Sequence, residues 1–309
     1  MSTTDQAVII WGEVLWDQFP DGPQLGGAPA NVAWHLGLAG GWARLVSRVG
    51  DDDLGRRALA RLGEVCDTSL VQIDPERETG VVEVSIVDGE PRYRLVPGRA
   101  WERIACTDEV IGALGEASVL VYGTLAQRTA AGLEGWRAGM AAAHGRCLKV
   151  CDVNLRKTEK PEIEEGVAVL AALERADVVK VNDRELDVLA TWLGWKDPIA
   201  ELRKRPRVVA VTHGARGATL YGEGGAGGRA PSGAHAIEIA GVPARPGGDN
   251  VGCGDAFLAI LVHGMTLGWD LATSGAAAAR WAAAVAEVRG ATPFFDEARV
   301  AELLGEDLE

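Results

Sequence analysis

The sequence predicts an α/β fold with a mostly parallel central sheet flanked by helices, and a small β-sheet appended to it as a lid. From residue 119 onward, short apolar runs alternate with stretches of helical periodicity, which is typical of parallel strands joined by right-handed crossovers. The 309 residues, 47% of them hydrophobic and 24% charged, are enough for one large α/β domain. Residues 79–96 predict a β-hairpin, which does not belong in a parallel sheet and is therefore expected in the lid.

The composition excludes several classes of function. Lys and Arg number 31 and Asp and Glu number 44, which gives a net charge of −13. An acidic chain without basic runs is not expected to bind nucleic acid or an anionic membrane. The five cysteines are scattered and form no Cys-x-x-Cys pair, which favours a reducing compartment and argues against a zinc site. The sequence shows neither a signal peptide nor a membrane-spanning run, so we expect a soluble, cytoplasmic protein.

The first piece of the lid is expected directly after a buried strand at residues 7–11. It spans about residues 13–25 and contains Asp17 in an otherwise apolar stretch. An unpaired carboxylate is costly to bury, so Asp17 predicts a partner in a ligand hydroxyl or a cation. An exposed Asp on a hairpin is the simpler explanation of the same residue.

A glycine-rich segment leads into the next expected helix, whose apolar residues run from 32 to 38. Pro29 suits the first turn of that helix, and Gly26 and Gly27 before it allow a ligand to approach the backbone closely. Asn31 then offers a donor and an acceptor from the first turn, which suits the hydroxyl groups of a sugar. A glycine turn followed by a helix cap explains these residues without a ligand.

The segment after this helix is expected to complete the lid. Residues 43–49 predict a strand, and the acidic run at residues 51–53 predicts a cap for the following helix rather than a metal site. The hairpin of residues 79–96 and Trp101 behind it make up the second lid piece, at about residues 79–101.

Polar clusters follow the carboxyl ends of four successive strands that we expect at residues 119–122, 148–151, 177–181 and 207–211. Ligands of parallel sheets bind beyond these ends of the strands. The joint placement of the clusters therefore predicts a binding site along this edge of the sheet. The clusters are Gln127 with Arg128, Asn154 with Arg156, Asn182 with Glu185, and Thr212 with His213 and Gly214.

Residues 247–257 read Gly-Gly-Asp-Asn-Val-Gly-Cys-Gly-Asp-Ala-Phe and carry the strongest chemical signal. A glycine-rich turn that opens a helix directs several N–H groups and the positive end of the helix dipole at one point, so it binds anions. Asp255 inside such a site would repel a phosphate unless it accepts a proton beside it. This combination predicts phosphoryl transfer with Asp255 as the base, although an ordinary helix N-terminus with Asp in its first turn has the same residues.

Together these motifs resemble the PfkB, or ribokinase-like, family of carbohydrate kinases, and the resemblance covers nearly the whole chain. Residues 26–31 and 50–55 resemble the N-terminal signature of the family, and Gly-Gly-Ala-Pro-Ala-Asn is typical of its fructokinase-like branch. Residues 249–257 resemble the C-terminal signature, and residues 182–185 match the Asn-x-x-Glu motif of the magnesium site. The resemblance implies a ribokinase-like three-layer sandwich with a β lid over the sugar.

The resemblance also implies the role of each candidate residue. Asp255 is the expected base, and the N–H groups of Gly252, Cys253 and Gly254 are the expected anion hole. The expected sugar-binding residues are Asp17, Gly26, Gly27, Asn31, Trp101, Arg128, Asn154 and Arg156, the last of them near the transferred phosphate. ATP and Mg²⁺ are expected at Asn182 and Glu185, through water, and the nucleotide at Thr212, Gly214 and Gly217. Asp249 is the expected ligand of a monovalent cation such as K⁺.

Three residues depart from the family pattern. Asn250 stands where the family usually has Thr, and Cys253 where it usually has Ala, but neither change removes a backbone N–H group. A thiol at a helix N-terminus beside an anion site would have a lowered pKa, but a simple replacement of one small residue by another is the favoured explanation of Cys253. His213 replaces a commonly apolar residue and is expected to pack beside the adenine or the ribose.

Several functions compete on the sequence alone. A fructokinase-like sugar kinase is favoured, and a kinase for 2-keto-3-deoxygluconate or a nucleoside is the alternative within the family. A sugar-binding regulator without catalysis is disfavoured because Asp255, Glu185 and the glycines of the anion hole are all present. A Rossmann oxidoreductase is rejected because the Gly-x-Gly-x-x-Gly at residues 222–227 is not followed by a helix, and a hydrolase based on Cys253 lacks an evident His partner.

The identity of the sugar depends on lid residues that the sequence does not place. The candidates for this selectivity are Arg92, Arg94, Trp101 and Arg128. An exposed edge of the lid is able to pair with a second copy of the chain, so a homodimer through the lid is also expected.

Overall fold

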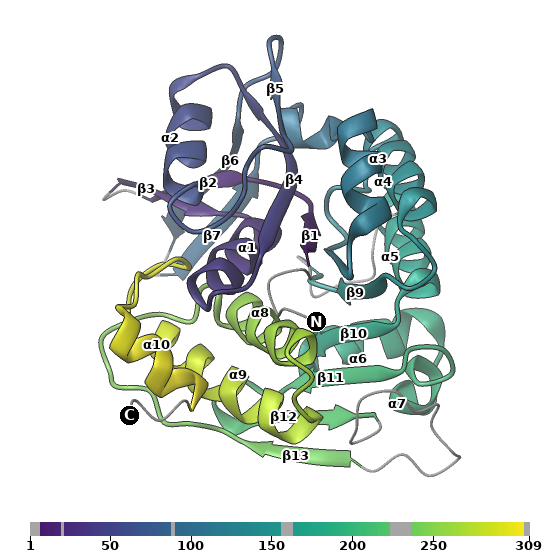
Figure 1. Cartoon of the computed structure of the whole chain (residues 1–309), viewed down its shortest axis with the longest axis vertical. Coiled ribbons are helices and arrows are strands. Elements are labelled where there is room, and N and C mark those ends of the chain that lie inside the picture. The colour runs from purple at the N-terminus through teal and green to yellow at the C-terminus, as the bar shows by residue number, and fades with distance from the viewer. Residues whose placement is uncertain (1–6, 20–21, 88–89, 156–162, 223–235, 306–309) are drawn as a thin grey trace.

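The computed structural model describes residues 7–19, 22–87, 90–155, 163–222 and 236–305, which form a large sheet, a small sheet and helices around them (Figure 1). The large sheet has nine strands and the small sheet has four. In order across the large sheet the strands are β13 (Ala236–Ala240), β12 (Gly217–Tyr221), β11 (Val208–Thr212), β10 (Val178–Asn182), β9 (Leu148–Asp152), β8 (Val119–Tyr122), β1 (Val8–Trp11), β4 (Ala43–Gly50) and β5 (Val71–Asp74).

The large sheet is parallel from β11 to β5, and β12 and β13 add an antiparallel edge. The predicted mostly parallel sheet is therefore confirmed. Its central strands read as apolar runs because both of their faces are covered. The antiparallel edge places the carboxyl end of β11 next to the start of β12, so the turn at residues 213–216 lies at the same edge as the other polar clusters.

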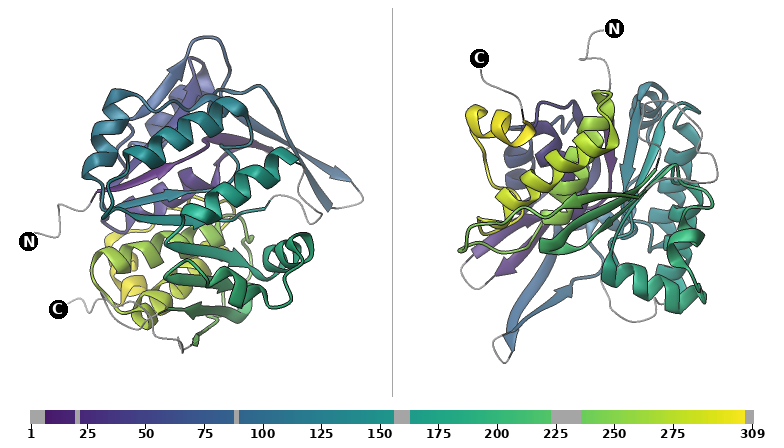
Figure 2. Two further views of the ribbon diagram at one scale, coloured as in Figure 1. Left: turned by 90° about the vertical axis from the view of Figure 1, so that its right-hand side faces the viewer. Right: turned by 90° about the horizontal axis from the view of Figure 1, so that it is seen from below.

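Helices cover both faces of the large sheet, which gives three layers (Figure 2). Successive residues of a strand point to opposite faces, and β1 shows this directly. Val8 and Ile10 pack in one core with α1, α8 and α9, whereas Ile9 and Trp11 pack in the other core with α3, α4 and α5. The helices are α1 (Ala28–Leu38), α2 (Asp53–Leu62), α3 (Asp108–Glu116), α4 (Ala130–Ala142), α5 (Ile163–Arg175), α6 (Asp183–Leu193), α7 (Pro198–Leu202), α8 (Cys253–Thr266), α9 (Leu271–Ala286) and α10 (Glu297–Leu304).

The small sheet is built from the two chain segments that were predicted to form the lid. Its strands are β2 (Leu15–Phe19), β3 (Gly22–Gly26), β6 (Gly80–Val87) and β7 (Glu90–Leu95), in the order β3-β2-β6-β7. The hairpin of β6 and β7 is confirmed and extends away from the body of the molecule (Figure 2). The predicted turn at residues 88–89 lies outside the described residues.

Three elements of the structure have no counterpart among the predicted ones: β5, α3 and α7. β5 is a four-residue edge strand that is mostly half-exposed, and α7 has only five residues, so neither has a strong hydrophobic period. α3 has a clear signal that was missed, because Thr107 caps it by accepting a hydrogen bond from Val110 N. None of the described helices combines the length and apolar character that crossing a membrane needs.

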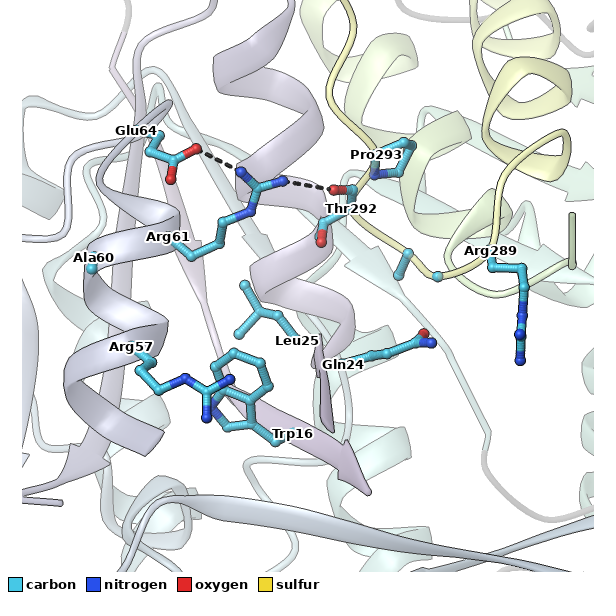
Figure 3. Close-up of a pocket in the computed structure, with 12 residues that line it drawn as sticks. Trp16, Gln24, Leu25, Arg57, Ala60, Arg61, Glu64, Arg289, Thr292 and Pro293 are labelled. Carbon is cyan, nitrogen blue, oxygen red and sulfur yellow. Dashed lines mark hydrogen bonds and ion pairs between the residues drawn. The ribbon is translucent and has the colours of Figure 1, made fainter. Parts of the chain in front are cut away.

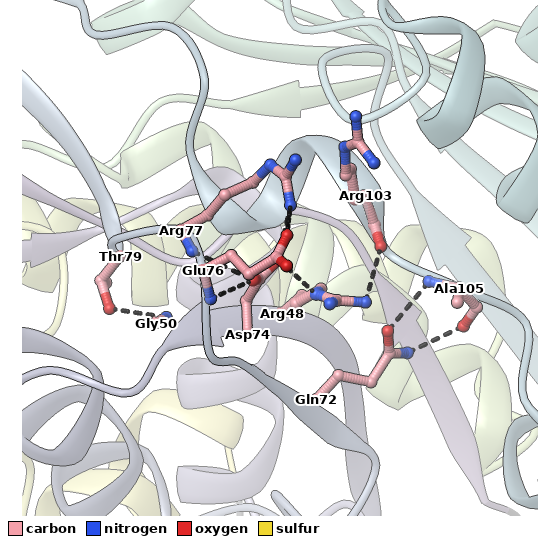
Figure 4. Close-up of polar contacts among 9 residues, drawn as sticks. All are labelled: Arg48, Gly50, Gln72, Asp74, Glu76, Arg77, Thr79, Arg103 and Ala105. Carbon is pink, nitrogen blue, oxygen red and sulfur yellow. Dashed lines mark hydrogen bonds and ion pairs between the residues drawn. The ribbon is translucent and has the colours of Figure 1, made fainter.

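A buried polar network holds the β4–β5 edge of the large sheet (Figure 4). Asp74 accepts hydrogen bonds from Arg48 Nε at 2.9 Å and from the backbone N–H groups of Glu76 and Arg77 at 2.9 and 3.0 Å. Burial acts to raise the pKa of Asp74, but these donors and the Arg48 charge together hold it below its ordinary value. The network keeps the segment that leads into β6 in one position.

The acidic run at residues 51–53 caps α2, as predicted. Asp52 Oδ1 accepts from Gly55 N at 2.7 Å, and Asp52 Oδ2 accepts from Thr79 N at 2.7 Å. Thr79 directly precedes β6, so this one carboxylate caps a helix of the main body and also holds the root of the small sheet.

Candidate active site

The first turn of α8 has the features of an anion-binding site. Gly252 precedes the helix with φ 77°, and a Cβ there would lie 2.6 Å from the Cβ of Ala291, so both the conformation and the space require glycine. Among the described residues, no side chain caps α8. The backbone N–H groups at this end of a well-buried helix are therefore available to a bound anion.

Asp255 lies buried in this first turn and contacts the start of α1. Asn31 Nδ2 donates to Asp255 Oδ2 at 2.7 Å, so the two residues predicted as sugar ligand and base meet although they are 224 positions apart. Asn31 is 4% exposed, and its Oδ1 has no hydrogen-bond partner within the described part of the chain. A buried acceptor without a donor is unfavourable, so this oxygen predicts a donor from a ligand.

Lys180 lies against the same turn and was missed by the sequence analysis. Its Nζ donates to both carboxylate oxygens of Asp152, at 3.0 and 3.1 Å, and a Cβ on Gly254 would lie 2.9 Å from Nζ. Burial acts to lower the pKa of Lys180, but the charges of Asp152, Glu185 and Asp255 raise it above its ordinary value. Lys180 therefore places a permanent positive charge beside the predicted anion hole.

A signal for Lys180 was present in the sequence. The residue interrupts the apolar strand Val178–Asn182 two positions before the Asn-x-x-Glu motif. A lysine inside a strand that is buried on both faces requires a partner, because an unpaired buried charge is very unfavourable. The partner lies on the neighbouring strand β9, which the sequence did not place next to it.

Asn182 and Glu185 form a capping box at the start of α6. Asn182 Oδ1 accepts from Glu185 N at 2.9 Å, and Glu185 Oε2 accepts from Asn182 N at 2.8 Å. Burial and the Asp152 charge raise the pKa of Glu185, whereas Lys180 lowers it, and the net direction is upward. Among the described residues, no three His, Cys, Asp or Glu side chains form a cluster that could hold a metal. The predicted magnesium role therefore requires water and phosphate oxygens as the other ligands.

A cavity of about 740 Å³ extends from the start of α8 along the ends of β10 and β11. Six of the residues with a predicted role line it, which are Asn182, Thr212, His213, Gly214, Gly217 and Cys253. Its opposite wall is apolar and comes from α9 and the segment after β13, chiefly Val242, Pro243, Ala279, Ala282 and Ala283. A polar end beside the anion site and an apolar remainder suit a nucleotide with its phosphates at α8.

His213 forms part of the wall of this cavity. Its Nδ1 lies 2.6 Å from Asp183 Oδ1, and its Nε2 lies 2.8 Å from Thr219 Oγ1. Because both ring nitrogens are engaged, the imidazole is held in place. This geometry agrees with the expected packing role and leaves no nitrogen for acid–base chemistry in this conformation.

The sugar-binding candidates of the first lid piece lie together. A Cβ on Gly26 would lie 2.6 Å from Asp17 Oδ2, so the carboxylate rests on the backbone of Gly26. Gly27, with φ 102°, directly precedes α1, and a Cβ there would lie 2.4 Å from the carbonyl oxygen of Glu13. These glycines thus hold Asp17 against Gly26 and form the turn that leads into α1, which carries Asn31.

Tyr93 is the lid side chain that faces this region, and it was not among the selectivity candidates. Burial and the carboxylates of Asp17 and Asp249 raise its pKa, so the phenol lies near both acids. Arg94 on the opposite face of β7 pairs instead with Glu83, 2.9 Å from its Nε. The side chain of Arg92 lies outside the described residues.

The remaining sugar-binding candidates are not brought together by the described contacts. Trp101 is 2% exposed, in the core beneath the root of the lid. Its ring leaves no room for a side chain at Gly80, the first residue of β6. Arg128 forms an ion pair with the buried Glu165. Asn154 has φ 40°, a left-handed conformation that is uncommon for a residue other than glycine and is often found at binding sites. Arg156 lies outside the described residues.

Asp249 connects the loop before α8 with the loop after α9. Its Oδ1 accepts from Val251 N at 2.9 Å and its Oδ2 accepts from Gly290 N at 3.1 Å. Cys253 follows closely, and the alternative of a lowered pKa for its thiol is wrong. Burial, with the charges of Asp249 and Asp255, raises the pKa of Cys253 to about 12.

Comparisons with known proteins agree with this geometry. The pfkB family carbohydrate kinase model matches residues 22–298. Fructokinase-1 of Zea mays is 30% identical over 244 residues, which cover 72% of this chain and 74% of that protein. The structure of fructokinase from Xylella fastidiosa with bound ATP superposes with a TM-score of 0.83 at 22% identity, over 97% of this chain and 98% of the other. That of a putative ribokinase II from E. coli with ATP and Mg²⁺ gives a TM-score of 0.81 at 19% identity, over 97% and 99% of the two chains.

Proposed function

Because the chain belongs to the pfkB family of carbohydrate kinases and is therefore a phosphotransferase with a hydroxyl acceptor, we propose that its acceptor is a primary hydroxyl of fructose or a related ketose. The observation that carries the proposal is the contact between Asn31 and Asp255 at the uncapped start of α8. At this contact, Asn31 supplies an amide that suits a sugar and Asp255 supplies a base. Each residue lies in the first turn of its helix, and the anion site lies in the same turn as Asp255. The 30% identity with the maize fructokinase supports the ketose.

The proposed mechanism follows from where charge develops. Asp255 accepts the proton of the sugar hydroxyl as that oxygen attacks the γ-phosphorus of ATP, and the bond from the γ-phosphorus to the β–γ bridging oxygen breaks so that ADP leaves. Charge in the transition state is spread over the phosphoryl oxygens, so N–H groups already directed at them contribute most to the rate. We assign this role to the N–H groups of Gly252, Cys253 and Gly254, which open α8, and Lys180 adds a positive charge directly behind Gly254.

The residues of the site fit ATP and Mg²⁺ as the cofactors. Asn182 lines the nucleotide cavity and is hydrogen-bonded to Glu185, which is not among the lining residues. Such a pair, without a cluster of acidic ligands in the described residues, suits an ion that keeps most of its waters and is bound chiefly by phosphate. When bound, Mg²⁺ would neutralise the phosphates beside Glu185. We also propose K⁺ or a similar monovalent cation at Asp249, whose carboxylate already joins the two loops behind the anion hole.

The small sheet is proposed to close over the bound sugar, within a single domain of residues 1–309. Tyr93 and Asp17 are the side chains that would cover it from the lid. A homodimer through the exposed lid edge and a cytoplasmic location complete the proposal. Residues Trp101, Arg128, Asn154 and Arg156 remain candidates for sugar selectivity.

The test is the Asp255→Asn variant assayed with a panel of acceptors. General-base catalysis typically contributes about 10²–10⁴-fold, so we expect ATP-dependent phosphorylation of fructose to fall by at least about 100-fold. Binding of fructose, measured by calorimetry, should persist. Turnover close to that of the unmodified protein would contradict the role of Asp255.

The acceptor panel tests the substrate separately. Fructose, ribose, 2-keto-3-deoxygluconate and adenosine are each supplied with ATP and Mg²⁺, and release of ADP is measured. Preference for the acid or the nucleoside would refute the ketose while leaving the kinase assignment intact. Absence of turnover with every acceptor, together with sugar binding, would instead favour a regulator that has lost catalysis.

A further inference from the structure

A second cavity of about 540 Å³ lies outside the residues assigned to sugar and nucleotide (Figure 3). Its walls come from α2, from the β2 and β3 strands of the small sheet, and from the loop of residues 289–293 that follows α9. It shares no lining residue with the nucleotide cavity. Its size is within the usual range for small-molecule sites.

The charge of this cavity is opposite to that of the protein. Arg57, Arg61 and Arg289 line it together with a single acid, Glu64, whereas the whole chain carries a net charge of −13. Local positive charge on an acidic protein concentrates anions at that point. A planar guanidinium group also donates two parallel hydrogen bonds to the oxygens of a phosphate, so arginine is well suited to bind one.

Two of these arginines are held in place before any ligand arrives. The guanidinium of Arg57 lies 4.9 Å from the ring centroid of Trp16, and that of Arg61 lies 3.9 Å from the centroid of Trp34. Arg61 also donates to Glu64 Oε2 at 2.6 Å and to the carbonyl oxygen of Thr292 at 3.3 Å (Figure 3). Stacking of a guanidinium on an aromatic face limits its motion, which lowers the entropy that binding an anion would cost.

The loop that forms one wall of the cavity also supports the active site. Trp34 Nε1 donates to the carbonyl oxygen of Pro293 at 2.8 Å, and Gly290 N donates to Asp249 Oδ2 at 3.1 Å. Ala291 packs against Gly252, the residue that opens the anion hole. A ligand that contacts this loop from the cavity therefore acts on the backbone directly behind the transferred phosphoryl group.

We propose that this cavity binds a small phosphate-bearing anion, and that the bound anion stabilises the loop of residues 289–293 behind the anion hole. Arg57 and Arg61 contact the phosphate, and the apolar side chains of Leu25 and Pro293 adjoin the rest of the ligand. Binding here goes beyond the proposed kinase activity and does not depend on which sugar is phosphorylated.

The test is the affinity of the full-length protein for two probes, inorganic phosphate and a hexose monophosphate, measured by calorimetry. The active site is first filled with a non-hydrolysable ATP analogue, Mg²⁺ and whichever acceptor the panel shows to be preferred, so that binding there does not contribute. We expect Arg57→Glu to weaken binding at least about tenfold, because it reverses the charge at one phosphate contact. The matched control is Arg56→Glu on the same helix, whose residue pairs with Asp51 outside the cavity and should leave the affinity unchanged.

The two probes separate the sources of the phosphate. Tighter binding of the hexose monophosphate assigns the site to a phosphorylated sugar, and equal binding assigns it to free phosphate. Absence of binding with the active site filled, or equal losses in the Arg56 and Arg57 variants, would overturn the proposal.

Hydrogen exchange tests the effect on the loop. Addition of the tighter probe should slow exchange at the backbone amides of residues 289–292 in the unmodified protein and not in Arg57→Glu. Gly290 is the most informative position, because its N–H group is bonded to Asp249. Unchanged exchange in the loop at saturating probe would overturn the proposed link to the anion hole.

Discussion

Two of the buried carboxylate networks among the described residues differ in the direction in which their surroundings move a carboxyl pKa. At the edge of the large sheet, Asp74 accepts from two backbone N–H groups and from Arg48, and its pKa is held below the ordinary value (Figure 4). At the carboxyl end of β10, Glu185 is buried beside Asp152 and its pKa is raised. In the first network, hydrogen bonds from the protein stabilise the charged carboxylate by more than burial destabilises it. In the second network, the effect of burial is the larger one.

This difference separates a structural network from a binding site. A carboxylate whose donors all come from the fold contributes to stability and does not need a ligand. The second network includes Asn31 Oδ1, which has no partner in the described residues, and the uncapped first turn of α8. Groups of this kind become satisfied when a cation, a phosphate or a hydroxyl group binds, so the incomplete network is the one expected to carry catalysis.

Among the variants that test this difference between the two networks, the largest effect is expected from Lys180→Met, which removes the positive charge behind Gly254. Loss of one pre-organised group that stabilises transition-state charge typically lowers kcat by about 10²–10³-fold, and we expect a loss of this size. The acid limb of the pH profile of kcat/KM should also move to higher pH, because Asp255 then loses a neighbouring cation. Steady-state kinetics between pH 5 and 9 measure both.

A double variant separates this electrostatic role from a structural one. Lys180→Met alone leaves the Asp152 carboxylate buried without its ammonium partner, which destabilises the fold. Lys180→Met with Asp152→Asn removes both charges and should recover stability without recovering kcat. Recovery of turnover in the double variant would show that Lys180 serves the fold alone.

The second prediction concerns His35, a buried histidine whose two ring nitrogens both have partners within the protein. Trp281 Nε1 donates to its Nδ1 at 3.1 Å, and its Nε2 lies 2.9 Å from the carbonyl oxygen of Ala291. Burial lowers the pKa of His35 from 6.5 to about 4. As pH falls from 6.5 to 4, His35 becomes protonated in the unfolded chain but stays largely neutral in the folded one. The free energy of unfolding should therefore fall by about 3 kcal/mol over this window.

Urea unfolding at a series of pH values measures this loss, and His35→Gln is the comparison. Gln does not titrate, so the variant should lose less stability between pH 6.5 and pH 4. His263, whose pKa is also lowered by burial, accounts for part of the slope that remains. Equal slopes in the two proteins would contradict the assignment of acid sensitivity to His35.

The third prediction tests the structural role of the network around Asp74. Asp74→Asn keeps the shape but removes the charge that Arg48 and two N–H groups stabilise, so we expect a loss of about 2 kcal/mol in the free energy of unfolding. Urea titration at neutral pH measures it. The kcat of the folded fraction should stay unchanged, and a large fall in kcat would place this network in the catalytic machinery.

The sequence predicted the parts of the site that depend on neighbours along the chain. The Gly-x-Gly-Asp turn, the Asn-x-x-Glu box and the glycines before Asn31 each specify a helix start by local rules, and each forms one in the structure. Lys180 and Tyr93 were missed because their importance depends on contacts across strands and sheets. The pairing of β10 with β9 brings Asp152 to Lys180, and the pairing of β6 with both β2 and β7 turns Tyr93 toward Asp17.

The activated thiol considered for Cys253 failed for a related reason. A helix N-terminus lowers a thiol pKa only where the sulfur faces the amides or a cation, and local sequence does not show which way it faces. In the structure, burial and the carboxylates of Asp249 and Asp255 outweigh the helix terminus.

The smallest effect is therefore expected from Cys253→Ala. The variant keeps the backbone N–H group of the anion hole, so kcat should change by less than about twofold. Alkylation by iodoacetamide at pH 8 should be slow at Cys253 in the unmodified protein, because a pKa of about 12 leaves very little thiolate. Rapid alkylation that bound nucleotide prevents, read by mass spectrometry of the peptide, would show instead that the sulfur faces the anion site and belongs to the incomplete network.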